Sequence, residues 1–306
     1  MSDTSGEKAV SKVEMDWHYC HHVVAYLDIL GQKEAFKDVK GVPREINEKA
    51  KLNEALKKTV TFISYFRKGF KNYFDGLAQS TVKEAALPTE FREEFFKLRR
   101  TSISMYGLSD AVVAWTSLMG DKYYVGLNSL YGILMASAGM FILSLACKHA
   151  IRGGIDLDGA ITLEPGSGEI YGPALNRAYQ LEKCRADYPR ILVGDGVMNY
   201  LKAMHAVVPE ERAMKHSKNM AARCRQLIFK DTDGAFAVDY LGSHVLQTWP
   251  AELPEKEVLI PARQFVRDEL ERWRREGDQK LTERYEHVLA YFNERLPVLG
   301  HHSGGY

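Results

Sequence analysis

The sequence contains two aspartates, Asp28 and Asp110, whose carboxylates are not readily explained by the needs of folding alone. Asp28 lies near the end of the run HVVAYLDILG, residues 22–31, which has the composition of a buried β-strand and stops on Gly31. An unpaired carboxylate in such a strand is costly, so it is usually paired, bound to a metal or placed at the strand end. Asp110, in YGLSDAVVAW, sits at a predicted hairpin turn before another apolar strand. If the two strands are neighbours, both carboxylates meet at one end of a sheet.

Such a pair of carboxylates predicts a particular chemistry. The two groups repel each other unless a cation neutralises them, and oxygen ligands without soft ones favour Mg²⁺ or Mn²⁺. A paired-ion site can activate a hydroxyl group and hold a triphosphate for in-line attack. The Leu30-Gly31 turn, which leads into a predicted helix, would offer free backbone N–H groups to phosphate oxygens. The alternative from spacing alone is that Asp110 is a turn residue and Asp28 a helix N-cap.

Strand-like and helix-like segments alternate along the chain and would position these residues. A long helix is predicted from Pro43 to about Asp75, and another begins at Pro88. The basic residues of the long helix, Arg67, Lys68 and Lys71, are interpreted as a solvated face. Further predicted elements are a hairpin turning at 107–110, a strand with a turn in IRGGIDLDGAITL, a strand or short element in RILVGD, a helix in PALNRAYQLEKCR and a hairpin in QLIFKDTDGAFAVDYL.

These elements indicate an α+β or α/β domain of about 235 residues, a usual size, followed by charged amphipathic helices. We expect a flexible N-terminus over 1–19, a catalytic domain over 20–255 and a C-terminal helical extension over 256–306.

Composition narrows the class of protein. The 306-residue chain has a formal net charge of +1, so nothing suggests nucleic-acid binding. Its N-terminus is polar, without the apolar core of a signal peptide, and its four cysteines are scattered, so we expect a cytoplasmic protein with reduced thiols.

Residues 125–147 carry no charge and are long enough to cross a bilayer. Because they lie between strand-like segments, we interpret them as a buried helix and not as a membrane anchor.

Four motifs together carry a resemblance to a known family. YLDILG, SDAVV, RGGI and EIYGPALNRAYQLE occur in the order found in the class III nucleotide cyclase catalytic domain. Within that class, the sequence motifs LDILG, RGGI and GPALNRAYQLE most resemble those of the pyrimidine cyclases of bacterial Pycsar anti-phage systems. The resemblance covers roughly residues 20 to 245. It implies a ferredoxin-like βαββαβ sheet covered by helices, with a long helical insert and C-terminal helices.

The resemblance also implies roles for individual residues. Asp28 and Asp110 match the two metal-binding aspartates, with the backbone carbonyl of Ile29 as a further ligand for two Mn²⁺ or Mg²⁺ ions. Asn176, in GPALN, stands where the class has its ribose-orienting asparagine. That residue faces the site of the opposite protomer, so a homodimer with active sites at its interface is implied. Lys230 precedes a turn at a position where the class often has a triphosphate-binding lysine, although an exposed hairpin lysine is the usual case.

Several positions depart from the pattern of the class. The base-reading lysine of purine cyclases is replaced by Tyr106, and the second base-reading position holds Glu169. A rigid ring should shrink the pocket and fit a pyrimidine, but a buried structural tyrosine is an equal alternative from the sequence. Gln180 occupies the position at which the class has its transition-state arginine. Arg177 would lie on a different face of the helix from that position, so it is no simple substitute. Arg152 is either a structural strand residue or a phosphate contact.

The function implied is a uridylate cyclase that converts UTP to 3′,5′-cyclic UMP and pyrophosphate. The product would be a second messenger for anti-phage defence that activates a separate effector protein. The alternatives are a cytidylate cyclase making cyclic CMP and a catalytically inactive nucleotide-binding module, which the missing arginine would favour. A purine cyclase is disfavoured by Tyr106.

Overall fold

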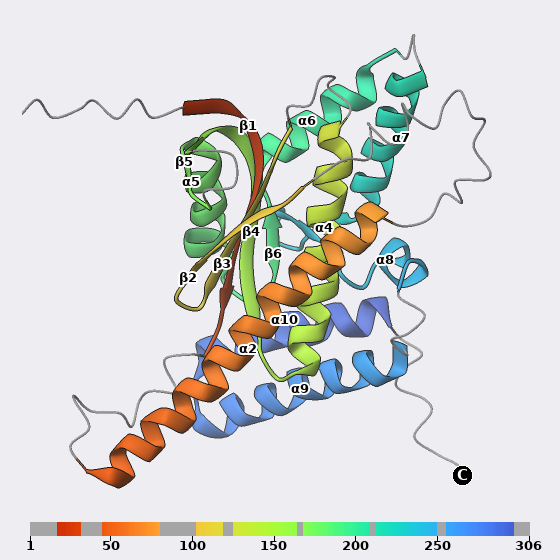
Figure 1. The fold of residues 1–306 in the computed structure, drawn as a ribbon. Coiled ribbons are helices and arrows are strands. Elements are labelled where there is room, and N and C mark those ends of the chain that lie inside the picture. Colours follow the sequence, from red (N-terminus) through yellow and green to blue (C-terminus); the bar gives the residue numbers. More distant parts are fainter. Residues whose placement is uncertain are drawn as a thin grey trace, which may run out of the picture.

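The structure is a computed structural model that describes residues 17–31, 45–79, 102–118, 125–163, 168–208, 212–249 and 255–296. The helices predicted after Gly31 and after Pro88 lie outside these residues, as does most of the predicted N-terminal segment. Within the described part, one sheet is covered by helices on both faces (Figure 1).

Eight strands form the sheet in the part of the chain that the structure describes. They are β1 (Trp17–Ile29), β2 (Ser104–Leu108), β3 (Ala111–Ser117), β4 (Ile151–Leu163), β5 (Ile170–Tyr171), β6 (Ile191–Val193), β7 (Ile228–Lys230) and β8 (Phe236–Val238). Their order is β2-β3-β1-β4-β6-β8-β7, with β5 paired to β4 outside that path. The strand pairs within β2-β3-β1-β4 are antiparallel, and β4 and β6 are parallel.

The helices are α2 (Ile46–Gln79), α4 (Val125–Ala146), α5 (Pro173–Gln180), a π-helical turn η2 (Leu181–Arg185), α6 (Asp195–Ala206), α7 (Arg212–Gln226), α8 (Ser243–Gln247), α9 (Glu255–Glu276) and α10 (Gln279–Arg295). α2 connects β1 to the β2–β3 hairpin, and α4 connects β3 to β4. This connectivity and the strand order β2-β3-β1-β4 make up a ferredoxin-like βαββαβ core. The predicted α+β fold is therefore confirmed.

The first strand is longer than the sequence pattern indicates. It begins at Trp17, inside the segment predicted to be a flexible N-terminus, and pairs with β4 over thirteen residues, from Trp17 opposite Leu163 to Ile29 opposite Ile151. Because the first half of β1 contains polar residues, a hydrophobicity pattern does not identify that half as a strand. The added residues 17–21 belong to the β4 ladder alone, whereas residues 22–28, up to Asp28, are paired with β3 and β4.

Alternation along β1 divides the molecule into two layers. Val23, Ala25, Leu27 and Ile29 point to the face covered by α2 and α4, where they join the main hydrophobic core. Val24 faces the other way and packs with residues of α5 in a second, smaller core. Figure 1 shows α5 and α4 on opposite sides of the sheet. Asp28 has the parity of Val24 and lies on the α5 face.

The uncharged helix α4 is the centre of the main core. Its residues 127–146 are long and apolar enough to cross a membrane, but 83% of the tested window is buried inside the molecule. It packs between the sheet and the helices α2, α7 and α9. The prediction that this stretch is a buried core helix is confirmed.

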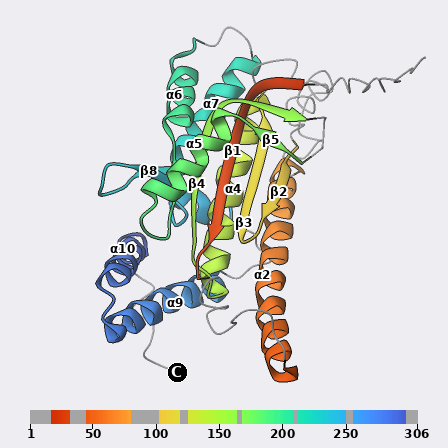
Figure 2. The same cartoon turned by 90° about the vertical axis from the view of Figure 1, so that its left-hand side faces the viewer.

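The C-terminal helices share this core. Phe265 and Leu270 of α9 and Val288 and Phe292 of α10 are buried in the same hydrophobic cluster as the sheet residues of β1. α9 packs across one end of α4, and α10 packs on α9 (Figure 2). These helices, predicted as an extension, therefore share the main hydrophobic core with the sheet.

Candidate active site

The two aspartates singled out in the sequence lie at the same end of the sheet. Asp28 pairs with Ala111 of β3, the residue directly after Asp110. The N–H of Ile29 donates to the carbonyl of Asp110 at 3.3 Å. β3 therefore lies beside β1, as the metal-site hypothesis requires. Because Asp28 is in a strand paired on both sides, the alternative that it caps a helix is wrong.

Negative charge gathers around a tyrosine on the same face. The pKa of Tyr26 is raised to about 12, first by burial and then by the neighbouring carboxylates of Asp28, Glu182 and Asp110. Its ring also meets Tyr179 of α5 edge-on, with 5.2 Å between ring centroids. Three carboxylates thus lie within electrostatic range of one phenol.

Arg152 supplies positive charge at this place. It stands opposite Asp28 in the β1–β4 ladder, and its Nη2 lies 3.8 Å from the Asp28 carboxylate. The same nitrogen lies 2.5 Å from the carboxylate of Glu182, whose side chain is only 5% exposed. A buried carboxylate requires such a partner. Arg152 therefore has a structural contact, and it also places a cation beside the aspartate pair.

Glu182 was not singled out in the sequence. It lies in the π-helical turn η2, directly after α5. A π-helical turn changes the residue spacing of a helix, so an α-helical pattern does not indicate which side chains it buries. The one available signal is an acidic residue in the segment that follows the GPALN motif.

The aspartate pair could hold a divalent metal ion. Within the described residues, no group of three or more His, Cys, Asp or Glu side chains is arranged to bind a metal. Two carboxylates and a backbone carbonyl, that of Ile29, are a small set of hard oxygen ligands. Such a set suits Mg²⁺ or Mn²⁺, because Mg²⁺ usually keeps several waters and is bound through one or two carboxylates and substrate phosphates.

One part of the phosphate-binding prediction is wrong. The N–H of Leu30 is not free, because it donates to the carbonyl of Ala150 at 2.8 Å. This bond continues the β1–β4 pairing by one residue beyond the ladder. Gly31 follows with a φ of +87°, a left-handed conformation that glycine adopts without strain. Leu30 is thus part of the sheet end, and the turn proper begins at Gly31.

The predicted base-reading residues have a common neighbour. Tyr106 pairs with Val113 across the hairpin and is 47% exposed, so the alternative that it is a buried structural tyrosine is wrong. The hydroxyl of Tyr171 donates to the carboxylate of Glu169 at 3.1 Å. This hydrogen bond raises the pKa of Tyr171, and Tyr106 lies close enough to raise it further. Tyr106 and Glu169 therefore belong to one exposed surface region.

Asn176 lies on the exposed side of α5. Its side chain and that of Gln180, four residues later, are exposed, whereas Ala174 and Ala178 are buried against the sheet. Arg177 is engaged elsewhere, since its Nε lies 2.8 Å from the carboxylate of Asp158 on β4. This contact agrees with the prediction that Arg177 does not replace the expected arginine.

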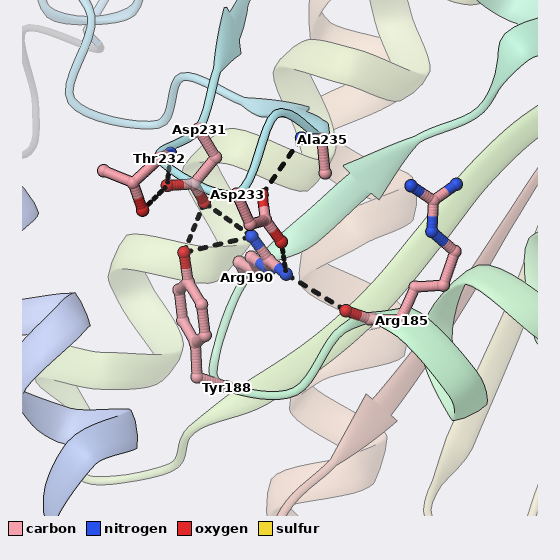
Figure 3. A network of polar contacts seen from close by, with 7 residues as sticks. All are labelled: Arg185, Tyr188, Arg190, Asp231, Thr232, Asp233 and Ala235. Carbon is pink, nitrogen blue, oxygen red and sulfur yellow. Dashed lines mark hydrogen bonds and ion pairs between the residues drawn. The ribbon is translucent and has the colours of Figure 1, made fainter.

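Lys230 lies apart from the aspartates in the same chain. It ends β7, the edge strand, which is four strands from β1, or about 19 Å at the usual strand spacing. The turn that follows is firmly held, as Figure 3 shows: Arg190 lies 2.7 Å from the carboxylates of both Asp231 and Asp233. The hydroxyl of Tyr188 also donates to Asp231. The hairpin predicted at Asp233-Gly234 is confirmed, and the lysine is exposed.

Arg67 also departs from its predicted role. Its guanidinium donates to the carbonyl oxygens of Ser109 and Ala111, on either side of Asp110. The prediction that Arg67 belongs to a solvated face is therefore wrong. Helical spacing does not reveal this contact, because its partners lie more than 40 residues away in the sequence.

Comparisons with known proteins add a remote likeness. No protein-family profile matches the sequence, and no curated protein matches it. Among solved structures, the chain is similar to a bacterial light-regulated adenylyl cyclase, with a TM-score of 0.40 and 9% sequence identity. The match covers 82% of this chain and 59% of the other, so this chain spans less than two thirds of that protein. At this level of similarity the comparison does not bear on the activity.

Proposed function

We propose that this chain is a metal-dependent nucleotide cyclase that converts UTP to 3′,5′-cyclic UMP and pyrophosphate. The observation that carries the proposal is the meeting of Asp28 and Asp110 at one end of the sheet, with the Arg152 guanidinium 3.8 Å from the Asp28 carboxylate. The ordered motifs from LDILG to GPALNRAYQLE support the choice of nucleotide cyclisation among reactions of this type.

The reaction is an in-line displacement within one nucleotide. The 3′-hydroxyl oxygen attacks the α-phosphorus, the bond from that phosphorus to the bridging oxygen breaks, pyrophosphate leaves, and the hydroxyl proton is released. Two Mn²⁺ or Mg²⁺ ions per site would lower the pKa of the hydroxyl and neutralise the α-phosphate. Asp28, Asp110 and the Ile29 carbonyl would hold these ions. Arg152 would add fixed positive charge beside the reacting phosphate, where such charge is most effective.

Other residues would position the substrate. The backbone at Gly31 would approach the triphosphate, with Leu30 fixing the start of the turn. Asn176 would orient the ribose, while Tyr106 and Glu169 would frame the base. A site that pairs with one base edge rejects analogues that leave its polar groups without partners. The exposure of Tyr106 and its place beside the Glu169–Tyr171 pair support this assignment.

We further propose that the active enzyme is a homodimer. In the class that the motifs resemble, the asparagine of one protomer completes the site of the other. The exposed side of α5, which carries Asn176 and Gln180, is compatible with such a contact. Lys230, four strands from β1, would likewise act on the triphosphate held by the partner protomer.

Two other functions are alternatives, and each predicts a different result when the chain is given nucleoside triphosphates. A cytidylate cyclase would use the same site with CTP. An inactive nucleotide-binding module would bind triphosphate without turnover, since Gln180 replaces an expected arginine. The proximity of Arg152 to Asp28 favours the active enzyme, because it places a cation at the site within the same chain. In the cell, we place the enzyme in the cytoplasm, where its cyclic nucleotide would activate a separate defence effector.

The test is product formation from UTP by the purified chain with Mn²⁺. Mass spectrometry should detect cyclic UMP together with stoichiometric pyrophosphate, and Asp28→Asn should abolish both. Cyclic CMP from CTP alone would assign the cytidylate alternative. Tight triphosphate binding without any product would favour the inactive module.

A further inference from the structure

The backbone that carries Asp110 is held from two directions. The guanidinium of Arg67, on α2, donates to the carbonyl of Ser109 at 3.1 Å and to that of Ala111 at 3.4 Å. The Asp110 carbonyl between them accepts from the N–H of Ile29 at 3.3 Å. Three consecutive carbonyls are therefore engaged by groups outside the turn. Hydrogen bonds with a charged donor are among the stronger ones in proteins.

The hairpin provides a space for this guanidinium. A Cβ added to Gly107 would lie 2.0 Å from Cζ of Arg67, so any side chain there would displace it. Ser109 has a φ of +54°, a left-handed conformation that is unfavourable for a residue with a Cβ. The surroundings must hold a residue in such a conformation. Arg67 bonds the carbonyl of this very residue.

The other end of the Arg67 side chain is fixed as well. Its neighbours on α2, Phe66 and Phe70, are fully buried in the main core. A long flexible side chain positions its target well only when its own backbone is anchored. α2 thus acts as a rigid support from which one guanidinium reaches the hairpin turn.

We propose that Arg67 is a positioning residue that sets the Asp110 carboxylate for metal binding. This inference rests on the proposed function, in which Asp110 is a metal ligand. Arg67 touches neither the metal nor the nucleotide in this account. It acts by fixing the turn, so that the Asp110 and Asp28 carboxylates lie at a separation that one cation can span.

The test compares Arg67→Ala and Arg67→Lys with the matched control Lys71→Ala. Lys71 lies one turn further along α2 and pairs only with Asp75 of the same helix among the contacts described, at 2.6 Å. Hydrogen–deuterium exchange of residues 103–113 reports on the turn with or without metal. Mn²⁺ titration monitored by electron paramagnetic resonance reports on the site, and kinetics with UTP separate kcat from KM.

We expect Arg67→Ala to speed exchange in the turn and to weaken Mn²⁺ binding at least tenfold. At saturating Mn²⁺ the KM for UTP should stay within twofold of wild type, because the nucleotide contacts are unchanged. Arg67→Lys should recover part of the loss, since an ammonium can bond one carbonyl but lacks the fork of a guanidinium. Lys71→Ala should match the wild type in all three measurements.

A second substitution tests the same contact from the other side. Gly107→Ala alone should displace the guanidinium and reproduce the Arg67→Ala effects. In the Arg67→Ala background it should add little, because no guanidinium is left to displace. Additive losses would overturn the inference, as would unchanged exchange and unchanged Mn²⁺ binding in Arg67→Ala.

The outcomes for the two proposals differ. A wild-type chain that binds no Mn²⁺ and makes no cyclic nucleotide overturns the proposed function, and with it the role of Arg67 in metal binding. Faster exchange in Arg67→Ala of that same chain would still establish the anchor of the turn. A wild-type cyclase whose Arg67→Ala variant is unaffected overturns the further inference alone.

Discussion

Asp28 and Arg152 stand directly opposite each other on β1 and β4, with 3.8 Å between the carboxylate and the guanidinium. The same guanidinium also bonds the buried carboxylate of Glu182. One cation thus serves two acidic groups, one inside the fold and one at the sheet end. In our account, this arrangement compensates the charge of Asp28 and provides positive charge for a phosphate, so Arg152 has separable effects on stability and activity.

The first prediction separates these effects. Arg152→Met should lower the free energy of unfolding by about 3 kcal/mol, because Glu182 is left buried without its cation. The double variant Arg152→Met/Glu182→Gln should regain most of that stability in urea unfolding. Cyclic UMP formation should stay at least tenfold below wild type in both variants. Recovery of activity along with stability would contradict a role of Arg152 at the phosphate.

The second prediction concerns the choice of base. Tyr106→Ala should enlarge the base site and remove one of its defining walls. The ratio of kcat/KM for UTP to that for GTP should fall about tenfold or more, since selectivity depends on the groups that pair with one base edge. Tyr65→Ala, which removes an exposed tyrosine from α2, serves as the control. An unchanged ratio would place base recognition elsewhere.

The third prediction concerns the C-terminal helices. Phe292 of α10 is fully buried in the main core, so Phe292→Ala should cost about 3–5 kcal/mol of stability. Because the helix shares its core with the sheet, unfolding should remain one transition with a lower midpoint. A separate early transition, with the remaining domain unaffected, would show instead that the helices are an independent appendage.

The fourth prediction is a dependence of stability on pH. Burial lowers the pKa of His149, whose ring stacks on Phe62, below its usual value of 6.5. The unfolded chain then binds more protons than the folded one, so stability is fully present above about pH 6.5 and is lost as the pH falls through it. His149→Phe should reduce the slope of stability between pH 7.5 and 5.5 in urea titrations. An unchanged slope would exclude His149 as a source.

Part of the site could be predicted from the sequence because its signals are local. Asp28 lies near the end of an apolar run and Asp110 lies in a hairpin turn, so strand and hairpin patterns place both at sheet ends. Their adjacency then requires only that β1 and β3 pair, which the ferredoxin-like order provides. The uncharged helix and the hairpin at Asp233-Gly234 were predictable for the same reason.

Other parts depend on contacts between distant segments. The carbonyl that accepts a hydrogen bond from the Leu30 N–H belongs to Ala150, far along the chain. The contact of Arg67 with the hairpin spans more than 40 residues, and Glu182 is buried by a π-helical turn that no simple periodicity reveals. Periodicity indicates which face of a helix is apolar, but it does not identify the group that a polar side chain meets across the fold.

One measurement tests the central claim most directly. The purified chain is incubated with an equimolar mixture of ATP, GTP, CTP and UTP and with Mn²⁺, and the products are separated and identified by mass spectrometry. The account predicts cyclic UMP as the main cyclic product, absent when Asp28→Asn or Asp110→Asn replaces the wild type. No cyclic nucleotide from any of the four substrates, at high enzyme concentration, would contradict it.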